Sequence, residues 1–94
     1  MIFGRFPFAD SPDTAAIACR HVLQGAPILR AVRDADDGMW QFLCGHPHQT
    51  DEARVISLQE ALKLDASLRK IARMPCGCAA VRSSAKERWI ISPR

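Results

Sequence analysis

The chain has 94 residues, of which 48% are hydrophobic and 24% charged. This length provides one compact domain rather than two, and the composition is typical of globular rather than disordered proteins. The formal net charge of +3 comes from cations scattered along a chain that has no tyrosine. Nucleic-acid binders usually gather their cations on one stripe with aromatic residues between them, so we expect no nucleic-acid partner.

The N-terminal stretch is apolar but interrupted by Arg5 and Pro7. No segment reaches the length of a signal peptide's apolar region or of a membrane span. We therefore expect a cytoplasmic protein that has no membrane association and keeps its four cysteines reduced.

We expect a single domain over 1–94, with an N-terminal arm over 1–12 and a core over 17–92. Three phenylalanines make the arm too apolar to lie in water, so it should pack on the domain or on a partner. Ser11-Pro12-Asp13 has the cap-then-proline form of a helix start and predicts a short helix over 12–17. From Ile17 onward the residues alternate, which favours a short strand, although the same stretch also fits a helix.

The clearest local signal is a β-hairpin formed by residues 28–33 and 39–44. The segment between them ends in Asp37-Gly38, and such a pair tolerates the positive φ that a hairpin turn needs. Because side chains alternate along a strand, Trp40, Phe42 and Cys44 should share one face of the hairpin.

After a loop over 45–51 and a short strand over 54–56, Ser57 and Glu60 form a capping box, which predicts a helix over 58–64. Asp65 can cap a second helix over 66–73. Two last strands are expected over 79–82 and 88–91. The sequence therefore predicts an α+β fold, in which a small antiparallel sheet with a central β-hairpin carries one or two short helices on one face.

A group of cysteine and histidine residues is the strongest candidate in the sequence for a chemically active site. Cys19 and His21 lie two residues apart, Cys44 and His46 repeat that spacing, and His48 follows a proline. If the two strands are neighbours, Cys19, His21, Cys44 and His46 could converge on a zinc ion, which prefers these ligands. The alternative is that both cysteines are small core residues and the histidines belong to a solvated loop.

The sequence contains no recognisable catalytic signature. Cys76-Gly77-Cys78 is a second thiol pair, but redox enzymes use Cys-x-x-Cys, and a turn that happens to hold thiols is the favoured interpretation. Because the sequence shows no phosphate loop and no recognisable catalytic triad, we expect no enzymatic activity.

Several segments resemble a bacterial family of immunity proteins from polymorphic toxin systems, formerly a domain of unknown function. The family has a pattern in which an acidic turn is followed by Gly, Trp, an aromatic residue and Gly. Residues 36–45 of this chain, Asp-Asp-Gly-Met-Trp-Gln-Phe-Leu-Cys-Gly, resemble this pattern. Residues 19–29 resemble the strand and glycine turn that precede this pattern in the family. Residues 55–68 resemble the helix that follows it, and residues 75–82 resemble the family's proline-glycine turn. Members often carry Pro-Pro-Gly-Trp where this chain has Pro75-Cys76-Gly77-Cys78. The resemblance implies a domain that binds and neutralises a partner protein.

The function that the sequence favours is therefore non-catalytic protein binding, with a toxin or another cytoplasmic protein as partner and no cofactor. The expected contacts are polar residues of the hairpin tip and of the following loop, namely Asp34, Asp36, Asp37, His46 and His48. The alternative function is zinc binding through the Cys/His ligands.

Overall fold

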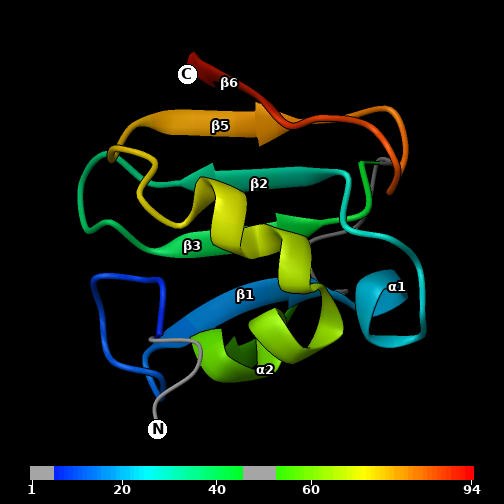
Figure 1. The fold of residues 1–94 in the computed structure, drawn as a ribbon. Coiled ribbons are helices and arrows are strands. Elements are labelled where there is room, and N and C mark those ends of the chain that lie inside the picture. Colours follow the sequence, from blue (N-terminus) through cyan, green and yellow to red (C-terminus); the bar gives the residue numbers. More distant parts are fainter. Residues whose placement is uncertain (1–5, 46–52) are drawn as a thin grey trace, which may run out of the picture.

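The structure is a computed structural model that describes residues 6–45 and 53–94. Within these residues, six strands form one sheet and three short helices accompany it, so the expected α+β fold is confirmed (Figure 1). The strands are β1 (Ala15–Cys19), β2 (Arg30–Arg33), β3 (Trp40–Leu43), β4 (Ala53–Ser57), β5 (Cys78–Val81) and β6 (Ile90–Pro93). The helices are α1 (Arg20–Leu23), α2 (Leu58–Leu64) and the 3-10 helix η2 (Ala66–Ile71).

The sheet is mixed rather than purely antiparallel. Its strand order is β4-β1-β3-β2-β5-β6, and β1 pairs with β3 in parallel, whereas every other pair is antiparallel. The difference from the sequence prediction has a simple cause in the path of the chain. After β1 the chain passes through α1 and enters β2 from the side on which β1 ended, so β2 runs back and β3 then runs parallel to β1 (Figure 1).

The predicted central hairpin is confirmed. β2 and β3 occupy the middle of the sheet in a register that places Ala31 opposite Phe42. The turn is closed by the Asp34 N–H, which donates to the Met39 carbonyl at 2.9 Å, and Gly38 supplies the positive φ of 72°. The Asp37-Gly38 pair therefore forms the hairpin turn that the sequence pattern predicts.

Helices α2 and η2 lie across one face of the sheet (Figure 1). The capping box at the start of α2 is present: the Glu60 N–H donates to Ser57 Oγ at 3.0 Å, and the Ser57 N–H donates to Glu60 Oε1 at 2.9 Å. The second predicted helix is a shorter 3-10 helix, capped as expected by Asp65, whose carboxylate accepts the Ser67 N–H at 2.9 Å.

The region before the hairpin differs from the sequence prediction. Instead of a helix over 12–17, residues after Ser11 form a turn, in which the Thr14 N–H donates to the Ser11 carbonyl at 3.0 Å, and β1 begins at Ala15. The stretch that alternates from Ile17 is then divided between the end of β1 and α1. Ladder hydrogen bonds to β3 and β4 on both sides of β1 outweigh the helix propensity of this alanine-rich segment.

The core is built on the covered face of the hairpin. Trp40 and Phe42 are buried, and their rings stack with centroids 5.8 Å apart. Phe8 from the N-terminal arm is also buried, with its ring edge-on to Trp40 at 5.2 Å. The described part of the arm therefore packs on the domain itself.

No helix in residues 6–45 or 53–94 is both long and apolar enough to cross a membrane.

Candidate metal centre

Two of the predicted ligands are brought together by the parallel pair of strands. Cys19 is the last residue of β1, and Cys44 directly follows the last residue of β3. Parallel neighbours end at the same edge of a sheet, and in Figure 1 both strands end on the side where α1 lies. Both cysteines are buried, with exposed fractions of 3% and 2%.

His21 reaches the same place by a route that the sequence pattern did not predict. Cys19 has extended backbone angles and acts as the N-cap residue of α1, so the chain turns immediately after it. His21 then lies in a helical turn rather than on the strand, and its Nδ1 atom stands 4.0 Å from Cys44 Sγ. The His21 ring is half-buried. The two buried thiols therefore lie on the core side of the group, and solvent can reach the group at His21.

The spacing of the three donor atoms is close to that of a zinc site. One ligand atom from each of Cys19, His21 and Cys44 lies within 4.8 Å of the other two. Tetrahedral zinc, with Zn–S about 2.3 Å and Zn–N about 2.0–2.1 Å, holds its ligand atoms roughly 3.5–3.8 Å apart. The donors would approach one another by about 1.3 Å at most, a shift of the size that side-chain rotations supply.

The remaining histidines of the predicted set, His46 and His48, lie outside the described residues. The sequence places His46 two residues after Cys44, and its role as fourth ligand stays a prediction.

The acidic hairpin tip, predicted to contact a partner, is partly engaged within the chain. Asp34 forms an ion pair with Arg94 at 3.2 Å and accepts a hydrogen bond from Gln41 Nε2 at 3.3 Å. The Asp37 carboxylate accepts the Met39 N–H at 2.9 Å, which stabilises the turn. Asp36 and Asp37 are exposed, and partner binding by the tip stays a prediction.

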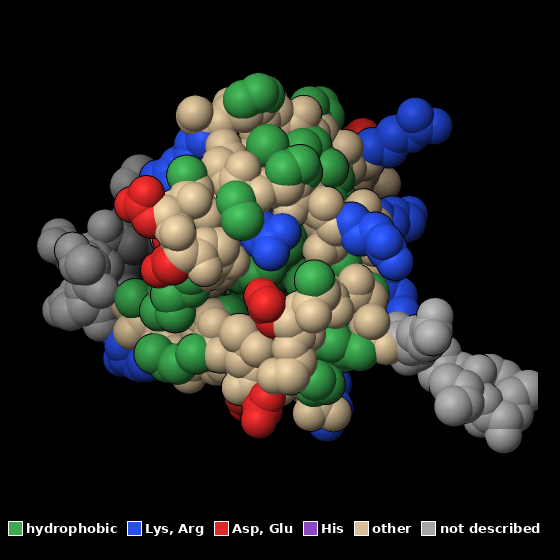
Figure 2. Space-filling model, turned by 90° about the vertical axis from the view of Figure 1, so that its left-hand side faces the viewer, with side chains coloured by type: hydrophobic (Ala, Val, Ile, Leu, Met, Phe, Trp, Pro, Cys, Tyr) green, Lys and Arg blue, Asp and Glu red, His purple; other side chains and the backbone are tan. Residues whose placement is uncertain are grey.

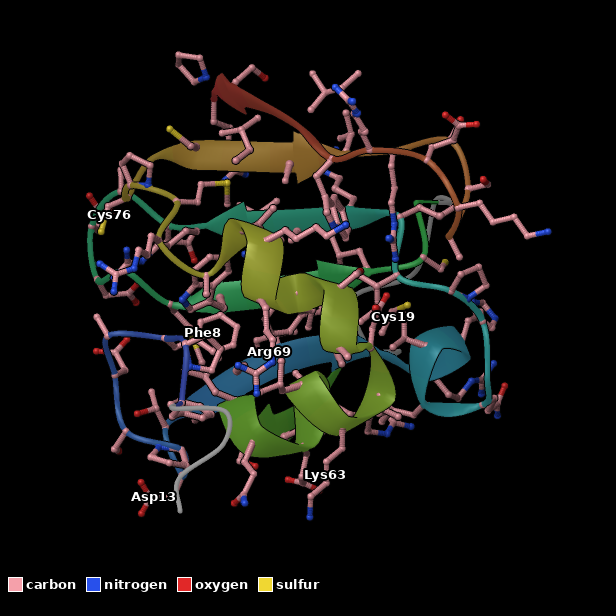
Figure 3. The ribbon with its side chains drawn as sticks, in the orientation of Figure 1. Phe8, Asp13, Cys19, Lys63, Arg69 and Cys76 are labelled. Carbon is pink, nitrogen blue, oxygen red and sulfur yellow. The ribbon has the colours of Figure 1, made fainter. Side chains whose placement is uncertain are left out.

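The second thiol pair is separate from this centre. Cys76 is exposed, Cys78 is half-buried, and both are free thiols flanking Gly77, whose φ is +84°. Figure 3 places Cys76 at the end of the sheet opposite Cys19. The pair therefore does not contribute to the Cys/His group.

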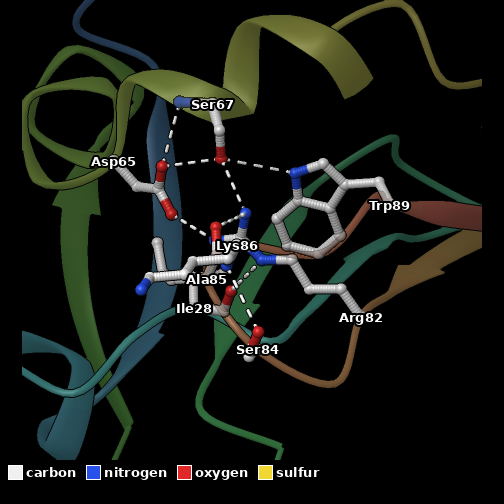
Figure 4. A network of polar contacts seen from close by, with 8 residues as sticks. All are labelled: Ile28, Asp65, Ser67, Arg82, Ser84, Ala85, Lys86 and Trp89. Carbon is white, nitrogen blue, oxygen red and sulfur yellow. Dashed lines mark hydrogen bonds and ion pairs between the residues drawn. The ribbon is translucent and has the colours of Figure 1, made fainter.

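A buried polar network that the sequence did not predict surrounds Arg82, whose side chain is 2% exposed (Figure 4). Its guanidinium donates to the Ile28 carbonyl at 3.0 Å and to Ser67 Oγ at 3.0 Å, and it forms an ion pair with Asp65. The Trp89 ring stacks on it at 4.1 Å. These partners lie far apart in the sequence, so no local pattern distinguishes Arg82 from the exposed arginines.

The chain was compared with protein-family models, with curated proteins and with solved structures, and none of the three comparisons found a match.

Proposed function

We propose that this protein binds a soft divalent metal ion, with zinc as the preferred one, through Cys19, His21 and Cys44. The observation that carries the proposal is the convergence of three donor atoms from β1, α1 and the end of β3 within 4.8 Å. Two thiolates and an imidazole favour zinc over magnesium or calcium, which take oxygen ligands.

Three protein ligands leave one tetrahedral position for a fourth donor. If His46 fills it, the site is closed and structural, and the metal ties α1 to the ends of two central strands. If water fills it, the metal keeps an exchangeable position. The immunity-type protein-binding role, which the sequence favoured, stays a prediction beside this proposal.

The direct test is metal analysis of the full chain purified without a histidine tag. We expect one zinc per chain, lost in Cys44→Ser and in Cys19→Ser and weakened in His21→Ala. Cys78→Ser is the matched control, because it removes a thiol of the separate pair and should leave the stoichiometry unchanged. Cobalt substitution provides a second measurement, since thiolate-bound tetrahedral cobalt absorbs in the visible range.

Two results would contradict the proposal. One is a protein that takes up no stoichiometric zinc or cobalt after reduction of its thiols. The other is Cys44→Ser protein that retains the full metal content. His46→Ala then distinguishes a closed site, in which metal affinity falls, from an open one, in which it does not.

A further inference from the structure

β6 is the strand at one edge of the described sheet. It pairs only with β5 among the strands that the structure describes, and all four of its residues are exposed. Ile90 is 65% exposed and Ile91 46%, and the neighbouring Val81 is 42% exposed. Figure 2 shows hydrophobic side chains gathered at the top of the molecule, where Figure 1 places β5 and β6.

Natural edge strands usually carry a charge, a bulge or a covering element that prevents another strand from adding. β6 has the sequence Ile-Ile-Ser-Pro and carries no charge, and only Pro93 lacks an N–H group. Pro93 protects the C-terminal end of this edge, whereas the apolar stretch before it is suited to pairing with an extended segment of another molecule.

The backbone of Ile91 faces outward. The Arg94 N–H donates to the Gly77 carbonyl at 2.8 Å, next to the paired residues Cys78 and Pro93. Because hydrogen-bonded and non-hydrogen-bonded pairs alternate along an antiparallel ladder, Ile90 and Ser92 direct their N–H and C=O groups toward β5. Ile91 therefore presents both backbone groups to the free edge.

A cationic hollow of about 340 Å³ lies on the helix-covered side of this edge. Its lining includes Ile91 and Trp89 together with the cations Lys70, Lys86 and Arg88, and Glu87 is its one carboxylate. Arg82 also lines it, but Asp65 neutralises that guanidinium. The hollow therefore carries a positive charge directly beside the outward-facing residue of β6.

We propose that β6 binds an extended peptide segment as an added strand, and that this segment carries an acidic side chain next to an apolar one. A residue opposite Ile91 projects from the same face as Ile91, toward Lys70, Lys86 and Arg88. Its two neighbours project from the other face, one beside Ile90, which is paired with Val81, and the other beside Ser92, which is paired with Ala79. The charge of the hollow and the apolar Ile90–Val81 pair on the other face together specify this partner, independently of the metal centre.

The test uses the full chain and three short fluorescein-labelled peptides, with Val-Glu-Val, Val-Ala-Val or Val-Lys-Val at the centre of an otherwise identical Ser/Thr sequence. Fluorescence anisotropy at low ionic strength should show saturable binding of the glutamate peptide. We expect it to bind about fivefold more tightly than the alanine peptide, since a partly screened ion pair contributes about 1 kcal/mol, and the lysine peptide should bind most weakly.

Two kinds of variant separate backbone pairing from charge recognition. Ile91→Pro removes the outward N–H group while leaving the bonds between β5 and β6, so it should abolish binding of all three peptides without unfolding the chain, as circular dichroism will show. The double variant Lys70→Glu/Lys86→Glu should reverse the preference between glutamate and lysine peptides. Lys63→Glu is a distant charge-reversal control with half the charge change of the double variant, because Lys63 lies on α2 at the opposite end of the molecule from β6 (Figure 3).

Four outcomes would overturn the proposal. The first is the absence of saturable binding by any of the peptides, and the second is equal binding by the wild type and a folded Ile91→Pro variant. The third is self-association of the chain, detected by sedimentation equilibrium and removed by Ile91→Pro, which would make a second copy the occupant of the edge. If Lys63→Glu reverses the peptide preference as strongly as the double variant does, then the net charge of the chain, and not the hollow, selects the peptide.

Discussion

A guanidinium is stable inside a protein only when both its charge and its N–H groups are satisfied. Arg82 meets this condition with a backbone carbonyl before β2, a hydroxyl and a carboxylate near the start of η2, and an aromatic ring before β6. Within the described part of the chain, every buried side-chain nitrogen and oxygen atom has a hydrogen-bond partner. The network therefore joins three segments that have no neighbouring positions in the sequence.

This arrangement predicts that lysine cannot replace Arg82. A lysine ammonium is a single point of charge and cannot reach Ile28, Ser67 and Asp65 at once, so Arg82→Lys should lower the free energy of unfolding by about 2 kcal/mol. Arg82→Met leaves the Asp65 carboxylate without its cation and should cost about 3 kcal/mol. Urea denaturation measures both changes, with the exposed Arg88→Lys as control. If Arg82→Lys unfolds at the same urea concentration as the wild type, the several hydrogen bonds of the planar guanidinium contribute nothing to the free energy of unfolding.

At the scale of elements, α2 begins at Ser57 because a side chain and a backbone group satisfy each other's hydrogen bonds there. Ser57→Ala removes the acceptor of the Glu60 N–H and should lower the free energy of unfolding by about 1 kcal/mol. Gln59→Ala, at an exposed position of the same helix, should change stability little or slightly increase it. If the two variants unfold at the same urea concentration, the cap does not stabilise the domain.

The elements that the sequence predicted well are those fixed by neighbouring residues. Asp37-Gly38 determines the hairpin turn, and Ser57 with Glu60 determines the start of α2. The parallel pairing of β1 with β3 and the change from strand to helix at Cys19 depend on packing between distant segments, which no local pattern encodes. For the candidate metal site, the structure brings together three of the four residues that the sequence singled out, whereas the geometry that joins them is not the one expected. His21 reaches Cys44 from a helical turn instead of from a strand face.

At the scale of the whole molecule, the proposed metal site and the free edge of β6 lie in different parts of the sheet. Cys19 and Cys44 end two adjacent central strands, while β6 is outermost and is separated from β3 by β2 and β5. A metal at the first site would act on folding stability, because it would tie three elements of the core together. Peptide pairing at β6 would leave that core unchanged.

Zinc should therefore stabilise the entire domain by mass action. A ligand that binds only the folded state at a free concentration of 100 times its Kd adds about 2.7 kcal/mol, which for a domain of this size corresponds to a rise in Tm of roughly 10 °C or more. Differential scanning fluorimetry of the reduced chain should show this rise with zinc and none with magnesium. Cys44→Ser should lose the zinc response, whereas Cys78→Ser should keep it, because its thiol lies outside the Cys/His group. An equal rise in Tm for Cys44→Ser and the wild type would mean that zinc binds elsewhere on the surface and that the buried thiols are only core residues.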